Sequence, residues 1–273
     1  MRRKKRRGLA AALCASAVFV WLGMPYALDE KQALTIEVIA PAQEVQTAAV
    51  QLKDAPSVLI YHTHTWEAYE MTADARYTPT ETWRTKDDAH NMVRVGEELA
   101  QALRDQGFSV THDQTDFEPP NLSSAYTRSL AMLDARLGAG ERYDYILDVH
   151  RDAFSALVDG ANSVEREGES IAYVMMLVGK GTGTTGSGFD ERPDWPQNLA
   201  LAQAITDAMN GETPGVAKPV KIKTGRFNQH VSTAALLVEV GNNLNTLEEA
   251  LAACPVIARA LAAVHAQRLK TEE

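Results

Sequence analysis

Two histidines and a glutamate follow directly after an apolar run at residues 58–61. The run reads Val-Leu-Ile-Tyr, and it leads into His62, His64 and Glu67. Neutral imidazole nitrogens and a carboxylate oxygen are ligands that a catalytic zinc takes, with one position left for water. The spacing His64-x-x-Glu67 lets one short turn aim both side chains at a single point. This segment therefore predicts part of a zinc site.

Two later apolar runs end in residues of the same chemistry. Residues 145–149 lead into His150, and residues 236–238 lead into Glu239. A carboxylate between two valines is costly to bury without a partner, and the role of general base beside a metal-bound water would explain it. The three stretches together supply two to three metal ligands and one spare carboxylate, which predicts a zinc hydrolase.

Four neighbouring residues have roles that the sequence leaves open. His62 is a ligand, a residue that orients a ligand, or a substrate contact. Arg151 and Asp152, which follow His150, form either a surface ion pair or a functional pair. In the functional pair, Arg151 steadies anionic charge near the metal and Asp152 orients an imidazole. His230 is an exposed loop residue or a donor to the developing oxyanion, and we favour the donor role.

Strands and helices must position these residues, and the two alternate from residue 58 onward. We expect strands at 58–61, 108–111, 145–149, 171–178 and 234–240, and helices at 91–106, 122–137, 198–209 and from 246 toward 269. Thr246 and Glu249 have the spacing of a capping box at the start of the last helix, whose continuity near Pro255 is open. The alternation predicts an α/β domain with a mostly parallel central sheet flanked by helices.

Sites in such sheets collect at the carboxyl ends of the strands. His64, His150 and Glu239 each lie at or near the end of a predicted strand. We therefore expect the three side chains to meet at one edge of the sheet.

Charge is divided unevenly along the 273 residues. Six of the 27 basic residues lie at positions 2–7, so the chain after Arg7 carries 21 basic and 36 acidic residues, a balance of −15. An acidic body argues against nucleic acid as a partner. The basic head is instead typical of a segment on the cytoplasmic side of a membrane.

An uncharged, largely apolar segment follows the basic head at residues 8–28. About 20 such residues suffice to cross a bilayer as a helix. We expect a basic cytoplasmic head at 1–7, a transmembrane anchor at 8–28, a juxtamembrane stalk at 29–56 and a catalytic α/β domain at 57–273. The protein would then be a single-pass cell-membrane protein with an extracytoplasmic domain. The alternative is a cleaved signal peptide, which also exports the body.

Several spaced motifs resemble the stage II sporulation protein P family. They are His62-Thr-His64-Thr-x-Glu67, Asn91-Met-Val-Arg-Val-Gly-Glu-Glu-Leu, Asp148-Val-His150-Arg151-Asp152, Asn228-Gln229-His230 and Leu-Val-Glu239-Val-Gly-Asn-Asn-Leu-Asn-Thr-Leu-Glu-Glu. The resemblance covers nearly everything from Val58 to the last helix, together with the basic head and the anchor.

The resemblance implies a zinc-dependent N-acetylmuramoyl-L-alanine amidase, which cuts the bond between glycan and stem peptide in peptidoglycan. The family is also credited with endopeptidase activity. It acts with sporulation proteins D and M in septal wall remodelling during engulfment. Carried over to this chain, His64, Glu67 and His150 are the zinc ligands and Glu239 is the general acid/base. The pattern His64-x-x-Glu67 is also similar to that of zinc carboxypeptidases, which favours His64 over His62.

Two other hypotheses stay open from the sequence. The first is a zinc carboxypeptidase or endopeptidase that acts only on stem peptides, with Arg226 or Arg151 as the cation for the substrate carboxylate. The second is a non-catalytic wall-binding module, against which the full set of ligands and Glu239 argues.

Overall fold

The computed structural model describes residues 55–153, 162–183 and 191–272. The predicted basic head, the predicted anchor and nearly all of the predicted stalk lie outside these residues. Among the residues that are described, no helix is both long and apolar enough to cross a bilayer.

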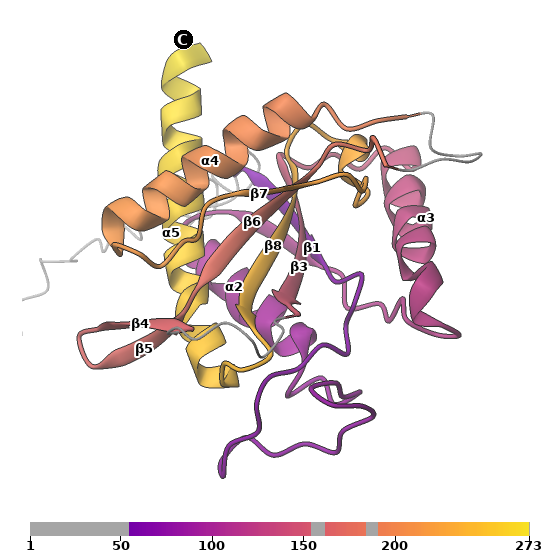
Figure 1. Ribbon diagram of the computed structural model, residues 1–273. Coiled ribbons are helices and arrows are strands. Elements are labelled where there is room, and N and C mark those ends of the chain that lie inside the picture. Colours follow the sequence, from indigo (N-terminus) through magenta and orange to yellow (C-terminus); the bar gives the residue numbers. More distant parts are fainter. Residues whose placement is uncertain (1–54, 154–161, 184–190, 273) are drawn as a thin grey trace, which may run out of the picture. The chain divides into compact units, whose positions relative to one another are not determined.

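A central sheet holds six strands of the described chain, in the spatial order β2-β1-β3-β8-β6-β7 (Figure 1). The strands are β1 (Ser57–Tyr61), β2 (Ser109–His112), β3 (Tyr145–Asp152), β6 (Val174–Gly179), β7 (Lys221–Lys223) and β8 (Ala235–Asn242). Neighbouring strands pair parallel except β6 and β8, which pair antiparallel. The prediction of a mostly parallel central sheet is confirmed.

The reversed direction of β6 follows from the hairpin that precedes it. Strands β4 (Ser163–Arg166) and β5 (Glu169–Ala172) pair antiparallel across Glu167 and Gly168, whose φ angles of 54° and 87° are those of a two-residue hairpin turn. Parallel pairing needs a crossover connection, and the described residues between β3 and β6 form this hairpin instead. The single strand expected at 171–178 is therefore wrong, because the chain breaks at Tyr173 into β5 and β6.

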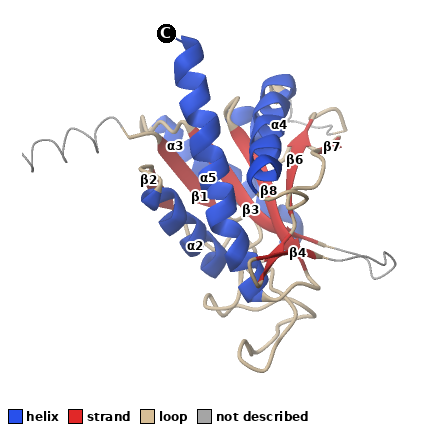
Figure 2. Ribbon diagram, turned by 90° about the vertical axis from the view of Figure 1, so that its left-hand side faces the viewer, coloured by secondary structure: helices blue, strands red, loops and turns tan. Residues whose placement is uncertain are grey.

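Helices cover both faces of the sheet. They are α2 (Met92–Asp105), α3 (Ala125–Gly138), α4 (Trp195–Glu212) and α5 (Leu247–Glu272), with short 3-10 turns η1 (Leu122–Ser124) and η2 (Gln229–Val231). α5 packs between α2 and α4 on one face (Figure 2), and α3 covers the other. The strands are buried on both faces as a result.

Local capping explains where two of the helices begin. The side chain of Asn91 accepts from the backbone N–H of Val93 at 2.9 Å at the start of α2. In α5, the Thr246 N–H donates to Glu249 Oε2 at 3.0 Å, and the Glu249 N–H donates to Thr246 Oγ1 at 3.2 Å. The predicted capping box is confirmed. α5 continues through Pro255 without a break.

The alternation of side chains along β1 divides the core into two clusters. Val58 and Ile60 pack with α2, α4 and α5, whereas Leu59 and Tyr61 pack with Leu133 of α3. A strand buried on both faces reads as a continuous apolar run. Because β1, β3 and β8 run parallel, the polar residues that follow β1 lie at the edge of the sheet where β3 and β8 also end.

Candidate functional site

The turn after β1 places His64 and Glu67. It is fastened to β3 through Asp148, which accepts the Thr63 N–H at 2.8 Å and the Thr63 hydroxyl at 2.7 Å. Glu67 is buried and His64 is half-buried. One buried aspartate thus fixes the start of the turn that carries both predicted ligands.

His150 lies between two carboxylates. Its Nδ1 is 3.4 Å from Glu67 Oε2, and its Nε2 is 2.8 Å from Asp148 Oδ1 in a contact that lacks hydrogen-bond alignment. Its ring lies 5.3 Å from the ring of His64, edge to face. Glu67, Asp148 and His64 therefore surround the His150 imidazole, and we call these four residues the cluster.

The electrostatics of this cluster favour positive charge at His150. Burial alone would lower the pKa of His150, but Asp148 and Glu67 outweigh it and raise that pKa well above the ordinary value. Burial alone would raise the pKa of Glu67, but His150, Arg151 and His64 together outweigh burial and lower the pKa to about 2. Burial, followed by the neighbouring His150, lowers the pKa of His64 to about 4.

Glu239 lies beside His150, because the two residues are partners in the register of β3 and β8. Its Oε2 is buried with no hydrogen-bond partner in the described part of the chain. Burial raises the pKa of Glu239 to about 7; Glu67 and Asp152 add to this rise, and His150 opposes it. A carboxyl group with a pKa near neutrality is suited to accept and return a proton.

The donor atoms of the cluster fit a zinc ion. Two atoms that bind tetrahedral zinc at about 2.0–2.2 Å lie about 3.4 Å apart, and 3.4 Å separates His150 Nδ1 from Glu67 Oε2. His64 Nδ1 is buried and has no hydrogen-bond partner among the residues that the structure describes, which makes it available as a third donor. Within the residues that are described, no group of three or more His, Cys, Asp or Glu side chains is already gathered to hold a metal.

Arg151 is buried, and it fastens the segment that carries Glu67. Its backbone N–H donates to Glu67 Oε2 at 3.2 Å, and its guanidinium donates to Ala68 O and to Trp83 O, each at 3.0 Å. It is therefore not the surface ion pair that one reading of the sequence expected. The sequence expected Asp152 to orient an imidazole, but the carboxylate that contacts His150 is that of Asp148.

His62 points away from the cluster despite its place on the same turn as His64. Its Nδ1 donates to Val149 O at 2.8 Å, and its Nε2 lies 2.9 Å from His112 Nε2. Burial, followed by His112, lowers the pKa of His62 to about 3, so the ring is neutral. Both nitrogens are occupied, which leaves none for the alternative ligand role.

His230 lies in η2, where the charged groups that act on it are Arg226, Glu191 and Asp134. Burial, followed by Arg226, lowers its pKa. Its Nδ1 is buried without a hydrogen-bond partner among the described residues. The predicted zinc ligands and Glu239 are not among these charged groups.

Tyr126 is a residue beside the cluster that sequence reasoning missed. Its ring lies 5.5 Å from the ring of His64 and 6.5 Å from that of His150, and nearly parallel to the latter. It stands at the start of α3, far from any of the histidine motifs in sequence. A polar aromatic on the first turn of a helix is too common a pattern to have identified it.

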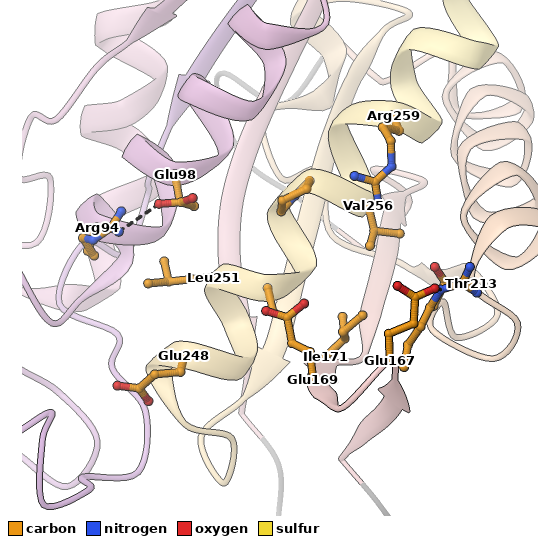
Figure 3. A pocket seen from close by; sticks show the side chains of 13 residues that line it. Arg94, Glu98, Glu167, Glu169, Ile171, Thr213, Glu248, Leu251, Val256 and Arg259 are labelled. Atoms are coloured by element: carbon orange, nitrogen blue, oxygen red, sulfur yellow. Dashed lines mark hydrogen bonds and ion pairs between the residues drawn. The ribbon is translucent and has the colours of Figure 1, made fainter.

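Two hollows on the surface differ in their relation to this cluster. One, of about 370 Å³, is lined by Trp66 and Lys86 among others, and Trp66 is only two residues from His64 in the sequence. The other, of about 710 Å³, lies between α2, α5 and the β4–β5 hairpin, and none of the predicted site residues lines it (Figure 3). Its Arg94 and Glu98 pair with each other at 2.8 Å.

Two solved amidase structures are among those that are similar to this chain. The N-acetylmuramoyl-L-alanine amidase from Clostridium difficile 630 is 14% identical, with 81% of this chain and 100% of that chain covered and a TM-score of 0.46. The CwlD amidase from Clostridioides difficile, solved in complex with the GerS lipoprotein, is 11% identical, with 79% and 99% covered and a TM-score of 0.46.

The sequence comparisons reach further. Stage II sporulation protein P of Bacillus subtilis (strain 168) is 28% identical over 240 residues, which cover 81% of this chain and 55% of that protein. This chain therefore matches only about half of the length of that relative. The family described as stage II sporulation protein P (SpoIIP) matches residues 25–262. Since that match takes in most of the chain, the resemblance seen in its motifs is confirmed, and this chain belongs to the stage II sporulation protein P family.

Proposed function

We propose that this chain is a zinc-dependent peptidoglycan hydrolase, an N-acetylmuramoyl-L-alanine amidase that acts on the septal wall during sporulation. The observation that carries the proposal is the meeting of His64, Glu67, His150 and Glu239 at one edge of the sheet, with polar atoms left unsatisfied. Membership of the family supports the link to sporulation.

His64, Glu67 and His150 would hold the zinc. When bound, zinc supplies a Lewis acid that polarises a carbonyl and lowers the pKa of water toward about 7. Glu239 removes the proton from the attacking water and returns it to the leaving nitrogen as the amide bond breaks. Asp148 orients His150, and Arg151 keeps the Glu67 segment in place.

The bond that we propose is cut joins the lactyl group of the glycan to the first alanine of the stem peptide. The full-length chain should be incubated with purified peptidoglycan, and the products identified by mass. An amidase releases intact stem peptides with a free amino terminus and leaves glycan without peptide. Glu239→Gln serves as the inactive control.

Other products would support the alternative functions. Shortened or uncrosslinked stem peptides that remain on the glycan would identify a carboxypeptidase or endopeptidase. Of the two cations expected for the substrate carboxylate in that alternative, Arg151 donates from its guanidinium to two backbone carbonyls, and Arg226 Nη1 donates to Glu191 O at 3.3 Å. Binding to the wall with no products would identify a non-catalytic module.

We further propose a single-pass location in the cell membrane, with residues 8–28 as the anchor and the catalytic domain outside. Sporulation proteins D and M are the proposed partners in the wall. The mass of the mature chain tests the anchor. A full-length chain in the membrane fraction supports the anchor, whereas a released product that begins near Ala27 or Asp29 would show a secreted enzyme instead.

A further inference from the structure

The ring of Tyr126 lies beside two of the proposed zinc ligands, and its hydroxyl group donates to no described residue. Its ring contacts those of His64 and His150, with centroids 5.5 Å and 6.5 Å away. The side chain is half-buried, and no described residue takes a hydrogen bond from its hydroxyl. A phenol, with an ordinary pKa of about 10, keeps its proton at neutral pH.

Phe227 and Asn228 contact Tyr126 and hold it in position. Asn228 Nδ2 donates to the Tyr126 carbonyl at 2.9 Å and to Ser129 Oγ at 3.1 Å. The ring of Phe227 packs edge to face against the ring of Tyr126 at 5.8 Å. Phe227 and Asn228 both have left-handed backbones, with φ of 50° and 54°. Non-glycine residues keep such conformations where the surrounding structure holds them, often at functional sites.

The other donors that the sequence suggested for the substrate oxygen are committed or elsewhere. Arg151 donates to two loop carbonyls, and His62 donates to Val149 O. His230 lies in η2, where the charged groups that act on it are Arg226, Glu191 and Asp134. Tyr126 is the one of these side chains that faces the two histidines.

We propose that the Tyr126 hydroxyl donates a hydrogen bond to the oxygen of the scissile carbonyl as negative charge develops there. Tyr126 then takes the role that the sequence assigned to His230. This inference rests on the proposed amidase function and names a further catalytic residue for it. A donor aimed at developing charge stabilises the transition state more than the bound substrate, so its loss acts mainly on kcat.

Tyr126→Phe in the full-length chain tests the inference, with Tyr143→Phe as the control. Tyr143 also has a hydroxyl group, but that group bonds to Glu141 on the surface. We expect Tyr126→Phe to lower kcat for stem-peptide release by about 10²–10³-fold. KM should stay within about twofold. The melting temperature and zinc content should match wild type, because the lost hydroxyl bonds to no described residue.

Several results would overturn the inference, and they separate it from the proposed function. An active wild type with a kcat for Tyr126→Phe within threefold would remove Tyr126 alone. A rise in KM with kcat unchanged would make it a binding contact, and loss of zinc would make it a ligand. An inactive wild-type chain would overturn both the inference and the proposed function.

Discussion

Two pairs of histidine rings lie close together in this fold and have nearly the same mutual geometry. His62 and His112 pack edge to face at 5.1 Å, and His64 and His150 do so at 5.3 Å, each pair with an interplanar angle of 83°. We call the first the closed pair and the second the open pair. His62 and His64 are separated by a single residue, yet their polar contacts differ.

In the closed pair, both ring nitrogens of His62 have hydrogen-bond partners. Val149 O can only accept, so His62 Nδ1 carries the proton and the neutral His62 Nε2 accepts from His112 Nε2. In the open pair, His64 Nδ1 has no partner in the described part of the chain, and His150 lies between Asp148 and Glu67. Residue type and ring geometry therefore do not distinguish the two pairs. An unsatisfied nitrogen does, whereas a carboxylate lies near a histidine of each pair, Glu97 near His112 and Glu67 near His150.

The largest effect that this comparison predicts follows from Glu239→Gln. Glu239 adjoins the open pair, and the change is nearly isosteric but removes the group that accepts a proton. Amidase turnover should fall by about 10²–10⁴-fold with zinc content and fold unchanged, as measured by product release and metal analysis. The control is Glu165→Gln, an exposed residue of β4, which should keep full activity. Turnover of Glu239→Gln within a few-fold of wild type would assign the proton transfer to another group.

A second prediction uses two aspartates that brace β1 at its opposite ends. Asp144 accepts the N–H and hydroxyl of Ser57 at 2.7 Å and 2.8 Å, much as Asp148 accepts those of Thr63. Only Asp148 also contacts His150. Asp148→Asn should therefore weaken zinc affinity by about 10–100-fold, whereas Asp144→Asn should not. Zinc titration of both variants measures the difference, and equal losses would show that Asp148 only braces the strand.

A third prediction concerns the closed pair. A Cβ at Gly96 of α2 would lie 2.4 Å from both His62 Nε2 and His112 Nε2. Gly96→Ala should lower the free energy of unfolding by about 1–3 kcal/mol through overpacking and leave one zinc per chain. Gly211→Ala in α4 is the control, since its Cβ meets nothing within 4 Å and alanine favours a helix by about 1 kcal/mol. Urea unfolding compares them, and a stabilised Gly96→Ala would contradict the tight packing.

The smallest predicted effect lies outside both pairs, at Asp113. Burial alone would raise its pKa, but Thr115 and Arg136, whose Nη2 lies 2.7 Å away, outweigh burial and lower it. A carboxyl group whose pKa is lower in the folded state than its unfolded value of about 3.9 stabilises the fold at pH values above about 3.9. This stabilisation is lost as the pH falls through the folded-state pKa. In Asp113→Asn, the free energy of unfolding should fall by less than in the wild type as the pH drops below about 4, and the zinc content should not change. Urea unfolding at a series of pH values measures this. The same pH dependence in the variant and the wild type would show that the ion pair of Asp113 with Arg136 contributes nothing to stability.

The parts of this structure that the sequence predicted are those that depend on local pattern. The apolar runs predicted β1, β3 and β8, and the spacing of Thr246 and Glu249 predicted the capping box. Because parallel strands bring their carboxyl ends to one edge, the meeting of His150 with Glu239 also followed.

The parts that escaped prediction depend on contacts between distant segments. Whether His62 or His64 belongs to the cluster is decided by Val149 and His112, from two other strands. The orienting role of Asp148 and the position of Tyr126 likewise need the packed fold. The direction of β6 depended on a short hairpin whose turn, Glu167-Gly168, was not recognised.

Zinc content measured by elemental analysis tests the central claim most directly. We expect one zinc per chain in the wild type and in His112→Gln, which alters only the closed pair. The double variant His64→Ala/His150→Ala, which removes the open pair, should hold none while remaining folded by circular dichroism. Full zinc occupancy in that folded double variant would contradict the assignment of the metal site.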